Sequence, residues 1–561
     1  MTTTPPVIPE LRVWQRVRRY AVPPAMIEAC TAAREAGDWR AACAAGRIDV
    51  TVDLAEVRRE HGRRHAELIE ADLAALAPDL LRWHLPRVLG GRTSVATHRQ
   101  FLLSVREGRL DPGDPVLVLS TPKTVDGSQR LRLAVRPAVE EEARRWDLPP
   151  VYWSVRHVDG LAAAHGGSPA RLPGFAPDGT VRFFEAYATT VDPADPASRS
   201  EVFDRCIAAG DLVAAWAATG VELDPTPPVS SRDDDAIEQV RAGVVTPVGL
   251  TAELTRLHRR YGVDRVAVGG RWWPTLEVRR RSDGTVTASF VKKPAGSHRH
   301  FLAEPVHTRP VDLELLRHGL IDPAALHPLV RRALLPHLTV DTAVRPDRID
   351  LRRSVPVRCR GEWHTVVHAD GRLDLASHTV EEVGREAALR ALGGPISGCF
   401  AVLDAWRSTG GWLPRQLREL RREVLQRLQH GGSAAFSALL DAGLDPLMRD
   451  GRGRTLLHHL RCVRDVTLVR RLVDAGVPLN AADRRGRTAL HVTVGDGGTP
   501  EMVRALLEAG ADPDLVDAED MSAAELAERK TYLYDDDEDE VPEEFRDVLR
   551  VRDVIEDWQT R

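Results

Sequence analysis

The chain has 561 residues, of which 43% are hydrophobic and 28% are charged, with a formal net charge of −5. These values are ordinary for folded globular domains and exclude a chain that is disordered throughout. The length predicts three or four domains. The sequence has no apolar run of about 18 residues and no secretory leader at its start, so we expect a cytoplasmic protein without a membrane span.

The cysteines and arginines indicate which classes of protein the chain does not resemble. Six cysteines are scattered without a Cys-x-x-Cys pair, which argues against a disulfide framework and against a clustered zinc site. Of the 77 basic residues, all except Lys123, Lys292, Lys293 and Lys530 are arginine, a bias typical of a GC-rich bacterial genome. The arginines of residues 1–430 are interspersed with carboxylates, so no basic stripe predicts a nucleic-acid partner.

The first four hundred residues predict an α+β body of two lobes, residues 1–200 and 201–412. Helical periodicity over residues 14–89 gives way to strand patterns, including a hairpin around Asp126-Gly127. Helices precede strands in the second lobe as well. We therefore expect each lobe to combine a small helical unit with an antiparallel sheet.

The opening of the second lobe echoes that of the first. Ala36-Gly-Asp38 begins an alanine-rich helix followed by a short strand, and Ala209-Gly-Asp211 begins a similar pair. An ancestral duplication would explain the match. Chance similarity between alanine-rich helices explains it equally well, because the echo covers only about 25 residues per copy.

A third sheet piece is predicted at residues 355–375, and it carries the densest set of metal-binding residue types. Cys359, His364 and His368 fall across this hairpin, and His378 follows it. Structural zinc sites normally have two pairs of closely spaced ligands, and only His364 and His368 have the spacing of such a pair. We therefore favour polar residues on the solvent face of a hairpin, and we expect no metal and no cofactor.

Motifs for catalysis are absent from the sequence. It has no nucleophile elbow, phosphate-binding glycine loop, dinucleotide fingerprint or zinc-protease helix. Catalytic groups are often distant in sequence, so this favours a non-catalytic protein without excluding an enzyme. The alternative is an enzyme or effector with its activity in residues 1–400, and a pocket of convergent titratable side chains there would favour it.

The clearest pattern lies towards the C-terminus. Asp450-Gly-Arg-Gly-Arg-Thr-Leu-Leu-His458 returns 33 residues later as Asp483-Arg-Arg-Gly-Arg-Thr-Ala-Leu-His491, and Gly443, Gly476 and Gly510 recur at spacings of 33 and 34. This period and this box resemble the ankyrin repeat, in which each copy is a β-turn followed by two antiparallel helices. The resemblance implies an all-α solenoid over residues 413–530.

The resemblance also assigns structural roles within each copy. His458 and His491 should bond the neighbouring turn rather than take part in chemistry, and the threonine three residues before each should cap a helix. A degenerate third copy at Ser522 and a helical half-repeat before the first copy are expected caps of the array.

In ankyrin proteins, the turn tips and inner helices form the recognition surface. Here the tips supply six arginines that we predict to bind a partner: Arg449, Arg452, Arg454, Arg484, Arg485 and Arg487. The third tip supplies Glu519 and Asp520 instead, so the surface should grade from positive to negative. We expect a protein partner with an acidic surface; ordinary charged turns are the equally weighted alternative.

The end of the chain is strongly acidic. Residues 512–561 contain 19 acidic and 6 basic side chains, and residues 535–540 are six consecutive carboxylates. We expect residues 531–561 to form an acidic loop and a capping helix. Our hypothesis is that this loop folds back on the arginine tips and competes with an acidic partner, so that its deletion tightens binding.

Overall fold

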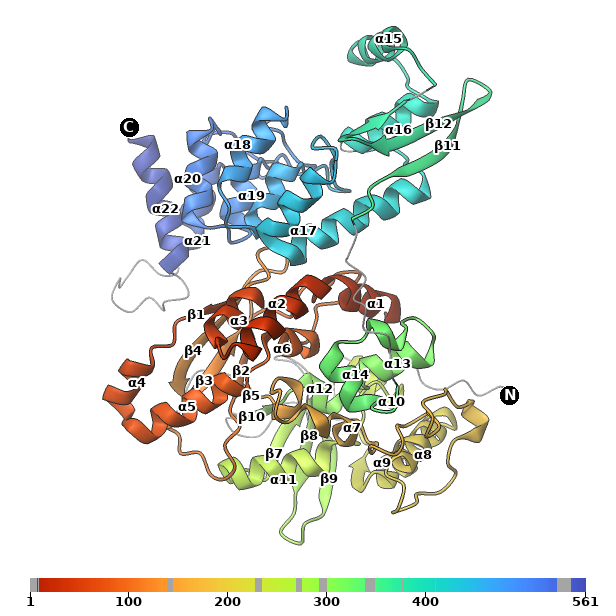
Figure 1. Cartoon of the computed structure of the whole chain (residues 1–561), viewed down its shortest axis with the longest axis vertical. Helices are drawn as coiled ribbons and strands as arrows, with labels where there is room; N and C mark the ends of the chain where they lie inside the picture. The colour runs from red at the N-terminus through yellow and green to blue at the C-terminus, as the bar shows by residue number, and fades with distance from the viewer. Residues whose placement is uncertain are drawn as a thin grey trace. The chain divides into compact units, whose positions relative to one another are not determined.

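The chain folds into two units in a computed structural model, which describes residues 8, 10–138, 145–227, 235–268, 275–291, 300–338, 349–375, 377–408, 410–531 and 546–560. The first unit comprises residues 1–122 and 130–346, and the second comprises residues 123–129 and 347–561 (Figure 1). Residues 347–412 therefore group with the C-terminal array, whereas the sequence pattern predicts them in the second lobe.

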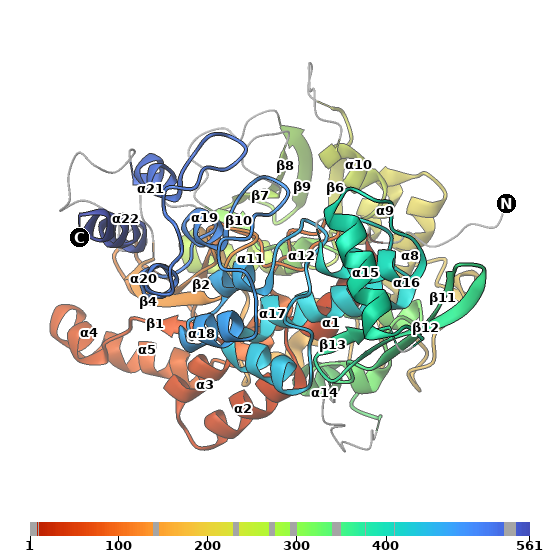
Figure 2. The same cartoon turned by 90° about the horizontal axis from the view of Figure 1, so that it is seen from above.

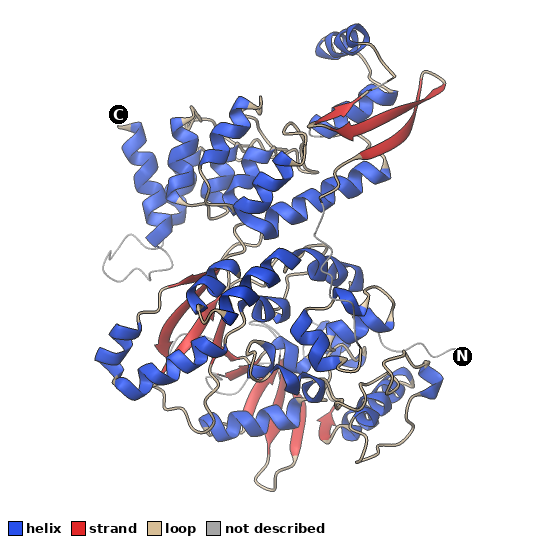
Figure 3. Cartoon of the chain, viewed as in Figure 1, coloured by secondary structure: helices blue, strands red, loops and turns tan. Residues whose placement is uncertain are grey.

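A ten-stranded mixed sheet lies at the centre of the first unit (Figure 3). Its strand order is β1-β4-β3-β2-β5-β10-β7-β8-β9-β6. The strands are β1 (Ile48–Val50), β2 (Gln100–Leu103), β3 (Pro115–Ser120), β4 (Leu131–Pro137), β5 (Arg145–Asp147), β6 (Val221–Asp224), β7 (Arg265–Val268), β8 (Thr275–Arg280), β9 (Val286–Val291) and β10 (His300–Leu302).

The two halves of this sheet follow the same plan. In the first half, β4, β3 and β2 form antiparallel hairpins, and β1 and β5 join their outer edges in parallel. Strands β9, β8 and β7, with β6 and β10 at their edges, repeat the arrangement, and β5 pairs with β10 in parallel. The sheet is therefore mixed rather than antiparallel, because longer crossovers return the chain to the parallel edge strands.

Helices cover the sheet, and those before β1 and β6 correspond as the sequence echo predicts. Asp38 accepts a hydrogen bond from the Ala41 N–H at the start of α3, and Asp211 does the same for Ala214 in α9, at 2.9 and 3.0 Å. The helices of this unit are α1 (Leu11–Tyr20), α2 (Pro24–Glu35), α3 (Trp39–Ala45), α4 (Leu54–His61), α5 (Arg63–Ala75), α6 (Pro78–His84), α7 (Leu161–Ala164), α8 (Ala197–Ala208), α9 (Leu212–Ala218), α10 (Asp235–Arg241), α11 (Leu250–Tyr261), α12 (Glu304–His307), α13 (Val311–Arg317) and α14 (Pro328–Leu334), with 3-10 turns η1 (Pro150–Tyr152), η2 (Val158–Gly160), η3 (Phe184–Ala186) and η4 (Pro323–Ala325).

The second unit begins with a small antiparallel sheet, β11 (Arg353–Cys359), β12 (Glu362–Ala369) and β13 (Arg372–Asp374). Figures 1 and 2 show β11 and β12 as a hairpin beside α16 (Gly398–Arg407). Val355 and Val357 on this hairpin belong to the same apolar core as the repeats that follow. This shared core explains why residues 347–412 group with the array.

The rest of the second unit is helical. Its helices are α15 (Val380–Ala391), α17 (Arg415–Asp441), η5 (Leu456–Cys462), α18 (Thr467–Asp474), α19 (Ala489–Gly495), α20 (Pro500–Glu508), α21 (Ala523–Thr531) and α22 (Arg546–Gln559). Helix α17 is two helices joined at Gly432, whose φ of 64° breaks the regular backbone. Within the described ranges, no helix has both the length and the apolarity needed to cross a bilayer.

Candidate functional site

A recurring aspartate shapes each turn of the array. The Oδ1 atom of Asp450 accepts hydrogen bonds from the backbone N–H groups of Arg452 and Arg454, at 2.7 and 2.9 Å. Asp483 makes the corresponding pair of bonds in the next turn. Burial alone would raise the pKa of Asp483, but these bonds and nearby arginines lower it overall, so the carboxylate stays ionised.

Successive turns are joined by backbone hydrogen bonds. The Arg484 N–H donates to the Arg452 carbonyl at 2.9 Å, and the Ala518 N–H donates to the Arg485 carbonyl at 2.8 Å. Gly486 has a φ of 74°, and a Cβ there would lie 2.9 Å from the Ala518 nitrogen. The glycine of the box is therefore needed both for its backbone conformation and for the close approach of the next turn.

The two box histidines are structural, which confirms the prediction made for them. In His491, Nδ1 lies 2.9 Å from the Thr488 hydroxyl, and Nε2 lies 3.0 Å from the Met521 carbonyl of the following turn. His458 makes the same bridge from Thr455 to the Arg487 carbonyl. Burial lowers the pKa of His458 to about 3, so this imidazole is neutral at physiological pH.

One of the six predicted contact arginines is buried. The side chain of Arg454 is 2% exposed, and its guanidinium lies 3.2 Å from Asp483 and 3.6 Å from Asp496. It joins neighbouring repeats instead of facing solvent, and sequence reasoning missed this because the turn pattern does not distinguish inward from outward positions. Arg454 is therefore not part of the exposed surface of the turns.

The other five arginines differ in exposure. Arg449 is half-buried and donates to the carbonyls of Gly453 and Ala482, at 3.0 and 3.1 Å. Arg487 is half-buried as well and lies 3.3 Å from Asp483. The arginines classed as exposed are Arg452, Arg484 and Arg485, and the third tip exposes Glu519 and Asp520. The order of charges along the tips is thus the one expected.

Residues 123–129, between β3 and β4, lie against the turns and inner helices of the array. Asp126 pairs with Arg452 at 2.9 Å, and its backbone carbonyl accepts a hydrogen bond from Arg461 Nε at 2.8 Å. The Thr124 hydroxyl donates to the Asp496 carbonyl at 2.8 Å. Neither Arg461 nor this intramolecular segment was expected, since the sequence places them more than 300 residues apart.

Comparison with known families agrees with this geometry. Residues 426–517 match a family model described as ankyrin repeats in three copies, and no family model matches the N-terminal region. The C-terminal array consists of ankyrin repeats. A comparison of the chain with curated proteins finds no match. Ankyrin repeats generally mediate binding between proteins.

A second candidate site is a cavity of about 430 Å³ in the first unit. Trp146 of β5 and Leu302 of β10 line it, so it lies where the two halves of the sheet meet. Its size falls in the range of small-molecule pockets, about 300 to 1,000 Å³. A cavity of this size is what the alternative hypothesis requires, namely an enzyme or effector with its activity in residues 1–400.

Three histidines converge on this cavity. Burial lowers the pKa of His84 to about 3 and the pKa values of His165 and His307 to about 4. Nε2 of His84 and Nδ1 of His165 and His307 are buried and lack a hydrogen-bond partner among the described residues. The cavity therefore presents neutral imidazoles with unused nitrogen atoms, which is typical of sites that bind or transform a ligand.

The charge around the cavity is mainly positive. Arg18 is paired with Asp312 at 2.6 Å. Arg99 lies 3.6 Å from Glu304 and stacks on the Trp146 ring, 4.5 Å from its centroid.

Arg87, in contrast, donates to the backbone carbonyls of Arg82 and Thr93, and no carboxylate within the described ranges is recorded as its partner. Burial lowers its pKa to about 9, so it is still charged at neutral pH. An anionic ligand would complement this guanidinium.

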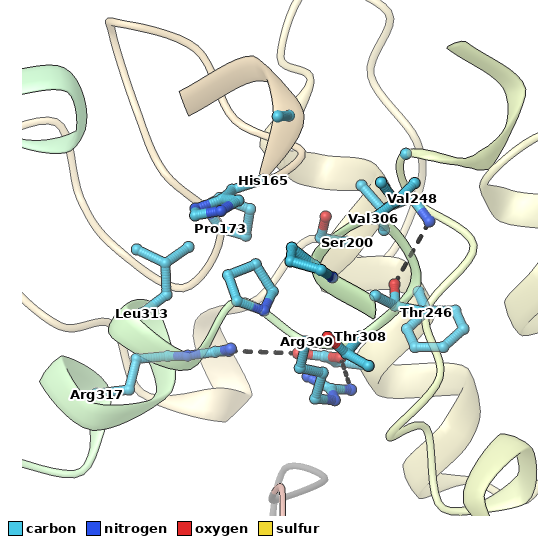
Figure 4. Close-up of a pocket in the computed structure, with 16 residues that line it drawn as sticks. His165, Pro173, Ser200, Thr246, Val248, Val306, Thr308, Arg309, Leu313 and Arg317 are labelled. Atoms are coloured by element: carbon cyan, nitrogen blue, oxygen red, sulfur yellow. Dashed lines mark hydrogen bonds and ion pairs between the residues drawn. The ribbon is translucent and has the colours of Figure 1, made fainter. Parts of the chain in front are cut away.

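The fourth arginine of the cavity is held by structural contacts. Arg309 and Arg317 both pair with Asp204 of α8 (Figure 4). Arg309 Nε also donates to the Gly243 carbonyl at 2.6 Å. Arg309 and Arg317 also line a smaller pocket next to the cavity, and His165 lies across that pocket from them. Arg309 therefore shapes the wall of the cavity, and Arg87 and Arg99 are the cations best placed to meet a ligand.

The acidic run at residues 535–540, which the sequence predicts to fold back on the arginine tips, lies outside the described residues. His307 is a buried residue that lines the cavity.

Proposed function

We propose that this chain is a protein-binding protein whose ankyrin array recognises an acidic segment of its partner. The observation that carries the proposal is the seating of Asp126 between Arg452 and Arg461 of the array. The turns pair an aspartate of the chain itself through Arg452 and bind its backbone carbonyl through Arg461, so they have the chemistry to hold an aspartate or glutamate from another protein. Arg484 and Arg485 extend this positive surface to the next turn.

The acidic third tip sets the orientation of the partner in this proposal. Glu519 and Asp520 would repel a carboxylate and attract a basic group, so a partner segment should run from acidic to basic along the array. Rim charges of this kind act mainly on association rate and specificity. The interaction should therefore weaken as salt is raised.

The test is charge reversal at one exposed tip of the full-length protein. Arg484→Glu with Arg485→Glu should abolish capture of partners that the wild type retains from cells. Arg470→Glu is the matched control, because Arg470 lies on α18 and its side chain is 86% exposed. Equal capture by all three proteins would contradict the proposal.

A second candidate function is favoured by the cavity, namely binding of a small anionic molecule by the first unit. We infer that the two halves of the sheet arose by duplication and that the cavity formed at their junction. Arg87 and Arg99 would contact the anion, and the three histidines would orient it through their unused nitrogen atoms. An enzymatic activity would then reside in this unit, with the ankyrin array selecting the target.

Thermal-shift screening of the full chain against nucleotides, sugar phosphates and carboxylic acids tests this second function. A stabilising compound should lose its effect in Arg87→Gln. It should keep its effect in Arg332→Gln, a surface arginine whose side chain is 54% exposed. If no anion stabilises the wild type, or if Arg87→Gln responds fully, the cavity does not bind anions.

A further inference from the structure

Four metal-binding side chains meet beside the small sheet of the second unit. They are Cys359, His364, His378 and Cys399, and one ligand atom from each lies within 4.8 Å of all the others. Three of these residues were considered in the sequence, but Cys399 was not, because 20 residues separate it from His378. The fourth sequence candidate, His368, lies elsewhere and bonds the Leu351 carbonyl at 2.9 Å.

The hairpin register explains how two ligands share one face. Val357 of β11 lies opposite His364 of β12, and Cys359 is two residues beyond Val357 on the same strand. Residues two apart on a strand point to the same side, so Cys359 and His364 project together. The tight turn between the strands has positive φ at Arg360 and Gly361, which suits a two-residue hairpin loop.

The other two ligands come from the segments on either side of α15. His378 immediately precedes Thr379, the capping residue of that helix, and Cys399 lies in the first turn of α16. Gly398 brings the start of α16 so close to the hairpin that a Cβ there would lie 2.5 Å from the Cys359 sulfur. Only glycine permits this approach, and Gly398 also has a φ of 62°.

The geometry of the cluster suits a tetrahedral ion. Four ligands around zinc lie roughly 3.3 to 3.8 Å apart when metal–nitrogen and metal–sulfur distances are about 2.0 and 2.3 Å. His364 Nδ1 and His378 Nε2 are 2.9 Å apart, so small outward shifts would admit the ion. Both sulfurs are buried, with Cys359 1% and Cys399 0% exposed.

The outward-facing nitrogen atoms of the histidines have carboxylate neighbours. His378 Nδ1 lies 3.5 Å from Glu382, and His364 Nε2 lies 3.9 Å from Glu362. Carboxylates in this position orient metal-bound imidazoles and raise their basicity. Glu382 also accepts the Thr379 N–H at 3.1 Å, which fixes it at the start of α15.

We propose that Cys359, His364, His378 and Cys399 bind one Zn²⁺ ion in a closed, structural site. All four positions are filled by protein ligands, which distinguishes such a site from a catalytic one. Each thiol releases its proton to solvent on binding, so two protons leave for each ion bound. The ion joins the β11–β12 hairpin to α16 and to the start of α15.

Helix α15 shows why such a link matters. None of its residues is buried, and Val380 and Leu392 at its ends are each 85% exposed. Its recorded attachments include the ion pairs Arg360–Glu386 and Arg390–Asp404. Val383 packs against the apolar core of the second unit. A helix with so little buried apolar surface gains from cross-links, and the proposed ion provides a strong one just before its N-cap.

Metal content of the full-length protein tests the proposal. Elemental mass spectrometry should find about one zinc ion per chain in the purified wild-type protein. The Cys399→Ser variant should lose this zinc. Cys206→Ser, a half-buried cysteine of the first unit, should keep it. In wild type, cobalt exchanged for zinc should give the visible absorption of a tetrahedral thiolate site, which does not depend on any variant folding.

Two results would overturn the zinc site. One is wild type that neither contains zinc nor binds cobalt with thiolate absorption. The other is a disulfide between Cys359 and Cys399, which would leave four rather than six cysteines open to alkylation after denaturation with chelator. Full zinc retention by Cys399→Ser would likewise remove that residue from the site.

Discussion

His165 provides a quantitative test of the cavity. Its ring is buried, and its pKa is lowered from 6.5 in the unfolded chain to about 4 in the fold, chiefly by burial. A lowered histidine pKa means that the unfolded state binds the proton more tightly. Stability is therefore intact above about pH 6.5 and is lost as the pH falls towards about 4.

The size of this loss follows from the two pKa values. At about pH 5 the unfolded imidazole is mostly protonated and the folded one is mostly neutral, which costs about 2 kcal/mol. His165→Gln removes the titrating group. When the pH is lowered from about 7 to about 5, the first unit of the variant should lose about 2 kcal/mol less than that of the wild type.

Pulse proteolysis in urea measures the free energy of unfolding at each pH. Following the peptides that come from the first unit restricts the measurement to that unit. The comparison is between the pH dependence of each protein, so any constant effect of the substitution cancels. Identical pH dependence in wild type and variant would refute the neutral, buried state of His165. It would also weaken the inference that the cavity presents unused imidazole nitrogen atoms.

Three further predictions concern the ankyrin array. His491→Ala removes the imidazole bonds to buried Thr488 and to the half-buried Met521 carbonyl, and it should lower the free energy of unfolding of the second unit in urea by about 2 to 4 kcal/mol; a change within experimental error would show that the bridge does not stabilise the array. Gly486→Ala should cost about 1 to 3 kcal/mol in the same assay, while Gly451→Ala, with open space around its Cβ, should be nearly neutral; equal effects would contradict the close approach. Asp126→Lys sets a like charge against Arg452 and should speed deuterium exchange in residues 123–129; unchanged exchange would show that this pair does not hold the segment.

The ankyrin array was predictable because its local rules repeat. Each box residue acts within its own turn or on the next one, so the spacing of Asp450, Thr455 and His458 already contains the relevant geometry. The echo at Asp38 and Asp211 was readable for the same reason, since each caps the helix that follows it.

The remaining features depend on contacts between distant residues. The mixed sheet arises from parallel edge strands, whose partners are set by crossovers rather than by local pattern. Cys399 joins its cluster only through the packing of α16 on the hairpin, and the burial of Arg454 depends on Asp496 in the next repeat. The spacing of residues along the chain does not show that these distant residues come into contact.

Site-specific photo-crosslinking of the full-length protein in its own cells tests the central claim most directly. A photoreactive residue in place of Arg485, on the exposed second tip, should form an adduct with a distinct partner protein. The same residue in place of Arg470, on the outer helix α18, should not. Adducts of equal yield at both positions, or none at Arg485, would contradict recognition through the ankyrin turns.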